Sequence, residues 1–478
     1  MGKLKVGYVG VAFGTYFAEE YDQYNRAING LEALAKELDF ELHPIRYGLL
    51  EGHQVESAAN ELEAAQIDFL LIEAAACGDG EAVVRLSKVA PRMGIWATPD
   101  PEQEGEIKIH GLVVVNQYAS ILKRYLRHNN VPYKWFYDHV ETDRFQKRFG
   151  ITIRALKALK GMSEARIGWI GGLSPGFLDM EFDAGKLENR LGGARIFSHE
   201  LAEIIDIAKS IDEKEAMAVA MDISSAGSEI RVTSGQMVKG ARVYLALKEM
   251  IARNNYTSLA VECWPQFQAQ YDVAPCMSYS WLGSEDGKAV SCEGDVMGAL
   301  SMQLLNELSG VKGSSTMLDM TAMDLEHNSM MMWHCGVSPR HFANKDGISW
   351  VNHTTLGRKT PEFFGVAGDM VFGAQETSIT YIGDSGDTLL VLKSNIVERD
   401  VKGFDGTRGW FTDFELNEEP INAIDLMNTM VVRGQEHHYA IGQGNMIDEL
   451  LECAAWWKMK LVEKVPYKDY LQLDGVNC

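Results

Sequence analysis

Acidic side chains stand at two points of the chain where a short apolar run ends. Glu262 follows the run 258–261, and Glu293 and Asp295 lie between the run 289–290 and a helical segment. A buried carboxylate without a partner is costly, so such a group requires a cation, an arginine or a proton. Carboxylates gathered at one sheet edge suit Mg²⁺ or Mn²⁺, which prefer oxygen ligands. The alternatives are a structural ion pair at Glu262 and a helix N-cap at Asp295.

The histidines are unevenly distributed along the chain. Four of the twelve lie between residues 327 and 353, and His437 and His438 are adjacent. His334, which precedes a cysteine and a glycine, is either a metal ligand or a core histidine. Neighbouring side chains on an extended segment point to opposite faces. We therefore expect at most one of His437 and His438 to enter a site directly, and the other to face the substrate.

Composition excludes several classes of protein. The 478 residues are 46% hydrophobic, which rules out a disordered chain, and no apolar run approaches the roughly 18 residues of a membrane span. The net charge of −22 disfavours a nucleic-acid partner, which needs a basic surface. Seven cysteines without a Cys-x-x-Cys pair argue against a zinc ribbon or a disulfide framework. With no signal peptide at the start, we expect a reduced, cytoplasmic protein that does not bind membranes.

The order of strand-like and helical segments predicts an α/β fold. Alternation in the first half implies parallel sheets covered by helices, and short strands rich in glycine and threonine dominate after about residue 350. Gly7 and Gly10 lack the Gly-x-Gly-x-x-Gly spacing of a dinucleotide site, so no nucleotide cofactor is expected. We predict an N-terminal α/β domain (1–163), a central α/β domain with the carboxylate motifs (164–345) and a β-rich, barrel-like domain with a terminal helix (346–478). The segment 111–115 is expected to be a strand, and 117–127 a helix.

Five short motifs occur in an order that resembles a known family. They are Glu-Cys-Trp-Pro at 262–265, Pro-Cys at 275–276, Cys-Glu-Gly-Asp at 292–295, Trp-His-Cys-Gly at 333–336 and His-His at 437–438. Together they resemble the L-fucose/L-arabinose isomerase superfamily, and its shorter fucose-isomerase-like members in particular. The resemblance implies two Rossmann-like parallel-sheet domains followed by a barrel-like domain, assembled into a homotrimer or homohexamer. It also implies aldose–ketose isomerisation at a divalent metal ion, usually Mn²⁺.

The resemblance assigns roles to individual residues. Asp295 and His438 match metal ligands, and Glu262 matches a ligand or general base. Because Glu262 lies far from Asp295 in sequence, Glu293 is its alternative. His334 and His437 are alternative ligands. Contacts with the sugar are expected from Trp264, Asn116, Trp333 and Tyr439, although the three aromatic side chains could equally belong to the core.

These residue types fit the chemistry of the implied reaction. Moving a carbonyl from C1 to C2 of a sugar removes a proton from one carbon and returns it to the next, through a negatively charged enediol. A cation stabilises that charge, and a carboxylate transfers the proton. The sugar is expected to be L-fucose, an arabinose or a 6-substituted hexose such as sulfoquinovose, whose charge would need a cation such as Arg340 or Arg358. The alternatives are a non-catalytic cytoplasmic sugar-binding or sensor protein, and a metal-dependent hydrolase or aldolase.

Overall fold

The computed structural model describes residues 2–356 and 365–474, and the chain forms two compact units, Met1–Lys157 and Ala158–Cys478. Arg358, one of the two arginines suggested for a charged sugar, lies outside the described residues. None of the helices in the described ranges has the length and apolar character needed to cross a membrane.

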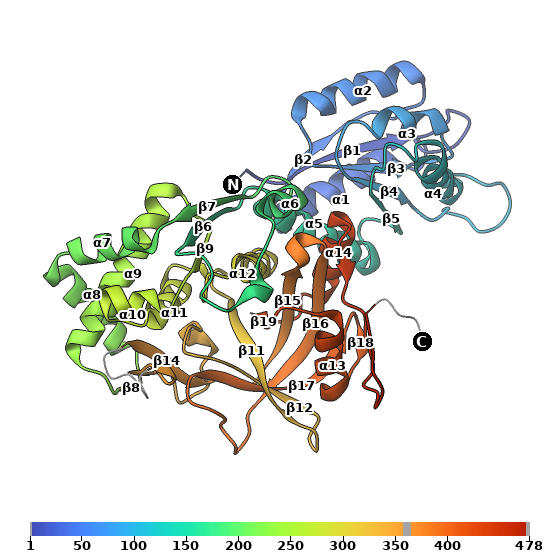
Figure 1. Cartoon of the computed structure of the whole chain (residues 1–478). Coiled ribbons are helices and arrows are strands. Elements are labelled where there is room, and N and C mark those ends of the chain that lie inside the picture. Colours follow the sequence, from blue (N-terminus) through green and yellow to red (C-terminus); the bar gives the residue numbers. More distant parts are fainter. Residues whose placement is uncertain (1, 357–364, 475–478) are drawn as a thin grey trace. The chain divides into compact units, whose positions relative to one another are not determined.

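The N-terminal unit is a parallel sheet whose strands alternate with helices (Figure 1). The strand order is β2-β1-β3-β4-β5, and every pairing is parallel. Parallel neighbours need long crossovers, which explains why a helical segment follows each strand. Its strands are β1 Lys5–Val11, β2 Glu41–Pro44, β3 Phe69–Ala74, β4 Met93–Ala97 and β5 Tyr133–Tyr137; its helices are α1 Gln23–Glu37, α2 Gly52–Ala65, α3 Gly80–Leu86, α4 Gly111–Ser120 and α5 Asp143–Ser163.

The expected strand at 111–115 is wrong, because this segment is the first half of helix α4. Its run of β-branched residues has the composition of a strand. The burial, however, follows the helical period: Val114, Val115 and Tyr118 are buried, whereas Leu112 and Val113 are exposed. The helix predicted at 117–127 therefore corresponds to the end of α4 and the short π-helical turn Ile121–Tyr125 that follows it.

The C-terminal unit begins with a second parallel sheet, in the order β10-β9-β6-β7. Because all four strands run the same way, the loops that follow them gather at one edge, where open α/β sheets place their sites. Its strands are β6 Arg166–Ile170, β7 Arg195–His199, β9 Ser258–Val261 and β10 Ala289–Ser291; its helices are α6 Ala184–Arg190, α7 Leu201–Ser210, α8 Glu213–Ser225, α9 Ser234–Asn254, α10 Gln266–Tyr271, α11 Cys276–Glu285 and α12 Val296–Ser309.

The remaining strands build an antiparallel barrel that closes on itself. Six strands pair in the order β16-β15-β19-β11-β12-β17, and β17 pairs back with β16. Helix α12 packs on β15 and β19 (Figure 1). The ring strands are β11 Ser315–Asp324, β12 Ser329–His334, β15 Gln375–Gly383, β16 Thr388–Val397, β17 Thr407–Leu416 and β19 His438–Gln443; shorter strands are β8 Glu229–Ile230, β13 Ser349–Asn352, β14 Val366–Val371, β18 Glu419–Pro420 and β20 Lys460–Leu461, with helices α13 Ala423–Arg433 and α14 Ile447–Trp457.

This architecture confirms the predicted fold class of two parallel-sheet regions followed by a β-rich, barrel-like region. Strands β11 and β12 belong to the ring although they precede residue 346. The predicted domain boundaries at 163/164 and 345/346 remain predictions.

Candidate metal centre and active site

Four side chains meet where the second parallel sheet approaches the barrel. Glu293 lies in the loop between β10 and α12, Asp319 on β11, His334 at the end of β12 and His438 at the start of β19. The barrel register explains part of this arrangement, because Asp319 is directly opposite His438 on one neighbouring strand and opposite Trp333 on the other. Cross-strand partners have adjacent Cβ atoms, so the barrel itself brings the aspartate and the histidine together.

One buried polar atom of each of these four residues has no hydrogen-bond partner. The atoms are Glu293 Oε2, Asp319 Oδ1, His334 Nε2 and His438 Nε2. His438 Nε2 lies 3.2 Å from Glu293 Oε2 and 3.7 Å from Asp319 Oδ1. Donor atoms of Asp319, His334 and His438 all lie within 4.8 Å of one another. Buried polar atoms are almost always paired, so four unpaired ones in one place indicate a site for a ligand that is positively charged.

Asp295 lies behind His438, and its carboxylate is already engaged. Oδ2 is 3.0 Å from His438 Nδ1, and Oδ1 accepts hydrogen bonds from the N–H of Gly298 and from the hydroxyl of Tyr381. The bond from Gly298 caps helix α12, so the alternative role suggested by the sequence is present. The contact with His438 leaves its other ring nitrogen facing Glu293 and Asp319. Such a carboxylate–histidine pair is typical of the support behind a metal-bound imidazole.

The electrostatics of the cluster favour positive charge. Burial lowers the pKa of His438, but Asp295, Glu293 and Asp319 together outweigh it and raise that pKa to about 10. Burial lowers the pKa of His334 as well, but Cys335, Asp319 and Glu293 outweigh it and raise that pKa to about 10. Burial raises the pKa of Asp319. Burial also opposes ionisation of Glu293, but the histidines outweigh it and lower its pKa. A potential that draws protons onto two buried histidines would equally attract a metal cation.

The loop that carries Glu293 has a fixed and unusual backbone. Glu293 has a φ of 62° and Gly294 a φ of 77°, both in the left-handed region. A Cβ on Gly294 would lie 1.9 Å from the carbonyl oxygen of Gly172, so only glycine fits this approach. The N–H of Ser174 donates to the carbonyl oxygen of Glu293. The loops after β6 and β10 therefore hold Glu293 in place together.

His437 belongs to the same site but faces a different partner. Its Nδ1 is 2.7 Å from Asp179 Oδ2, its Nε2 is 3.7 Å from Glu293 Oε2, and its ring stacks on Phe177. His438 is fully buried, whereas the His437 side chain is 36% exposed. Both histidines nevertheless offer donor atoms to one potential metal-binding group with Glu293, within 4.8 Å of one another, whereas we expected at most one of them to enter the site directly.

Glu262 stands apart from this cluster. It follows β9, its side chain contacts Gly171, and among the described residues it belongs to no group of three or more potential metal donors. The residue is fully buried, and neither carboxylate oxygen has a hydrogen-bond partner. Burial alone raises its pKa to about 7. A carboxyl group that changes protonation near neutral pH is suited to proton transfer.

The expected sugar contacts lie in different surroundings. Trp264 and Trp333 are half-buried, and the indole N–H of Trp333 donates to the carbonyl of Asp405. Tyr439 is buried beside His438. Asn116 is exposed on α4 in the N-terminal unit. Arg340, the described arginine suggested for a charged sugar, is paired with Glu285.

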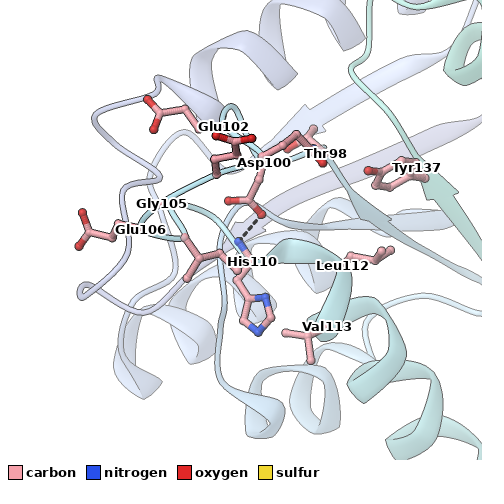
Figure 2. A pocket seen from close by; sticks show the side chains of 12 residues that line it. Thr98, Asp100, Glu102, Gly105, Glu106, His110, Leu112, Val113 and Tyr137 are labelled. Carbon is pink, nitrogen blue, oxygen red and sulfur yellow. Dashed lines mark hydrogen bonds between the residues drawn. The ribbon is translucent and has the colours of Figure 1, made fainter.

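The N-terminal unit has a polar pocket of its own, with a volume of about 600 Å³. It lies between the loop after β4 and the N-terminus of α4 (Figure 2). Asp100 shapes this loop by accepting hydrogen bonds from the N–H groups of Lys108, Ile109 and His110. Asn116 is not among the residues that line the pocket.

Sequence reasoning missed Asp319, although a signal for it was present. Asp319 interrupts the apolar run Met317, Leu318, Met320 of a strand. The same kind of interruption, an acid at the end of a buried run, drew attention to Glu262. Asp179 and Tyr381, which hold His437 and Asp295, had no comparable signal, because their contacts join segments far apart in the chain.

Comparison with known proteins found relatives along most of the chain. A sulfoquinovose isomerase of Priestia aryabhattai is 26% identical over 403 residues, which cover 84% of this chain and 86% of the relative. A sulfoquinovose isomerase of Alkalicoccus urumqiensis is 25% identical over 400 residues, 83% of this chain and 86% of the relative. Another, from Clostridium sp. (strain MSTE9), is 26% identical over 269 residues, 55% of this chain and 56% of the relative. No protein-family model matches the chain.

These similarities support an enzyme of the sugar-isomerase type, an intramolecular oxidoreductase that interconverts an aldose and a ketose. The expected likeness to the fucose-isomerase branch stays a prediction. The buried carboxylate and histidine groups could hold a metal ion.

Proposed function

We propose that this chain is a divalent-metal-dependent aldose–ketose isomerase that moves a sugar carbonyl between C1 and C2. The observation that carries the proposal is two potential metal-binding groups that share His438, one with Glu293 and His437 and the other with Asp319 and His334. Glu293, Asp319, His334 and His438 each have a buried donor atom without a hydrogen-bond partner. The side chains of Glu293 and Asp319 are 14% and 30% exposed, so a small substrate can reach the cluster.

The donor set suits Mn²⁺ or a similar cation. Two carboxylates and two imidazoles provide oxygen and nitrogen ligands of intermediate hardness. Glu293, Asp319 and His438 would hold the ion, with His334 as a further ligand. A cation bound here would act as a Lewis acid that stabilises the negative charge of the enediol. We assign Asp295 to the support of His438 rather than to the metal itself, because hydrogen bonds occupy both of its oxygens.

The proton transfer requires a group that can be both base and acid. In the aldose-to-ketose direction the proton leaves C2 and is delivered to C1. Glu262 remains our candidate for this role, because its pKa of about 7 favours exchange in both directions. Glu293 is the alternative, because its Oε2 lies 3.2 Å from His438 Nε2 and 3.7 Å from His437 Nε2. His437, held by Asp179 at the open side, is placed to donate a hydrogen bond to a sugar hydroxyl.

The substrate we propose is sulfoquinovose or a closely related monosaccharide, on the strength of the relatives' names. Trp264, Trp333 and Tyr439 are the proposed contacts with the sugar in the C-terminal unit. The expectation that Asn116, in the N-terminal unit, contacts the sugar stays a prediction. A homotrimeric or homohexameric assembly and a cytoplasmic location remain parts of the proposal.

The experiment is a substrate panel. The metal-stripped protein is incubated with sulfoquinovose, L-fucose, L-arabinose and D-arabinose in D₂O, with and without Mn²⁺, and the products are followed by NMR. We expect conversion of sulfoquinovose to its ketose only when metal is present, with solvent deuterium entering at the carbon that receives the proton. Binding of a sugar without conversion of any would favour the sensor protein, and conversion without metal would overturn the metal requirement.

A further inference from the structure

Four of the chain's seven cysteines lie together in the interior, beside the proposed active site. They are Cys263 after β9, Cys276 at the start of α11, Cys292 after β10 and Cys335 after β12, and all are buried. The thiol of Cys335 lies within 4.8 Å of the thiols of both Cys276 and Cys292. The proposed isomerase reaction uses none of these side chains.

The distance between two of the thiols matches the sulfur–sulfur distance in a tetrahedral metal–thiolate site. Cys276 Sγ lies 3.8 Å from Cys335 Sγ, too far for a disulfide. With Zn–S bonds of about 2.3 Å, the sulfur atoms of a tetrahedral site are about 3.8 Å apart. Cys335 also shares a group with Cys292 and His334 in which the donor atoms lie within 4.8 Å of one another. Cys335 is therefore the central thiol.

A cavity lies next to this cluster on the side of His353. A cavity of about 320 Å³ is lined by His353 and by the carboxylates of Asp369 and Asp405. His353 is itself buried, and one of its ring nitrogens lies within 4.8 Å of the thiols of Cys276 and Cys335. Arg231 also lines the cavity, and Asp369 is paired with Arg408. The link between the cavity and the sulfur atoms is therefore His353.

We propose that two of these thiols and His353 form a second metal site, for a thiophilic divalent cation such as Zn²⁺, bound by Cys276, Cys335 and His353. Binding displaces the thiol protons, so the cysteine ligands are thiolates. The site is chemically distinct from the oxygen and nitrogen cluster of Glu293 and Asp319, because soft sulfur ligands select a different ion. The absence of a Cys-x-x-Cys pair hid it in the sequence, since its ligands come from three separate segments.

Cadmium titration tests the proposal in the full-length, reduced, metal-stripped protein. Excess Mn²⁺ is present to compete at the oxygen and nitrogen cluster. We expect one equivalent of Cd²⁺ to bind with a sulfur-to-metal charge-transfer band in the ultraviolet. Cys276→Ala and Cys335→Ala should lower the affinity at least tenfold. Cys453→Ala, which removes a buried thiol from α14, should leave it unchanged.

A measurement on the unaltered protein covers the case in which a variant fails to fold. X-ray absorption at the zinc edge of the Zn²⁺-loaded protein should show sulfur neighbours at about 2.3 Å. A shell of oxygen and nitrogen alone, or a charge-transfer band that survives both cysteine variants, would overturn the proposal and identify the thiols as inert core side chains. Neither readout uses isomerase activity, so failure of the proposed thiolate site can be distinguished from failure of the proposed function.

Discussion

His438 and Asp295 form a buried hydrogen-bonded pair in which Nδ1 of the imidazole lies 3.0 Å from Oδ2 of the carboxylate. The pair turns Nε2 toward Glu293 and Asp319. Asp295 also caps helix α12, so the helix and the proposed metal site share one side chain.

Asp295→Asn should weaken metal binding without unfolding the protein. Asparagine is as good an N-cap as aspartate, so the cap itself should change stability by about 1 kcal/mol or less. Loss of the negative partner of His438 should lower Mn²⁺ affinity roughly 10- to 100-fold, the usual effect of removing a supporting carboxylate. Isothermal titration with Mn²⁺ measures this. Asp319→Asn is the comparison, and it should abolish binding. Equal and complete losses in both variants would make Asp295 a ligand after all.

Glu262→Gln should separate proton transfer from metal binding. The amide has nearly the same shape but cannot exchange the proton, so we expect kcat to fall by about 10²- to 10⁴-fold. Mn²⁺ affinity should stay within twofold, because the structure places Glu262 outside the donor groups of the described residues. Glu293→Gln should impair both. Full activity of Glu262→Gln would transfer the role of base to Glu293.

Glu73 should make the stability of the N-terminal unit depend on pH. This carboxyl group on β3 is fully buried, accepts a hydrogen bond from the Tyr8 hydroxyl, and burial raises its pKa from 4.5 to about 8. The folded state therefore holds a proton that the unfolded chain releases above pH 4.5, so stability is greatest below that pH and falls as pH rises to 8.

Glu73→Gln keeps the acceptor for Tyr8 and removes the titration. Relative to the unaltered protein, the variant should gain about 3 kcal/mol between pH 5 and pH 8, since each pKa unit corresponds to about 1.4 kcal/mol. Urea unfolding at the two pH values measures the gain. Glu61→Gln, an exposed change on α2, is the control. An equal difference at both pH values would contradict a protonated Glu73.

Gly294→Ala should displace Glu293. The added Cβ would lie 1.9 Å from the Gly172 carbonyl oxygen, so the loop must move. We expect loss of Mn²⁺ binding and a destabilisation well above 1 kcal/mol. Gly310→Ala is the matched control. It also has a positive φ, of 66°, at the other end of α12, but its Cβ would meet no atom within 4 Å. It should cost about 1 kcal/mol and leave metal binding intact.

Local sequence patterns predicted the parallel sheets and the segments that contribute to the site, but they did not predict which atoms come into contact. Alternating periods predicted the parallel strands, and a run of valines misled at 111–115 because composition outweighed the helical period there. Glu293, Asp295, His334 and His438 were all identified from the chain. Which of these residues are proposed metal ligands and which one supports a ligand depends on the pairing of Asp319 with His438. That pairing joins strands more than a hundred residues apart in the chain. No local signal encodes that register.

The closed ring of six strands affects how the enzyme loses activity on heating. Asp319, His334 and His438 lie on strands that are hydrogen-bonded on both sides within the ring. Local unfolding begins at free strand edges and chain termini, so these three ligands are not the first residues to lose their structure. Heat should therefore leave activity intact until the C-terminal unit unfolds as a whole, so inactivation and loss of its secondary structure would fall on the same temperature curve.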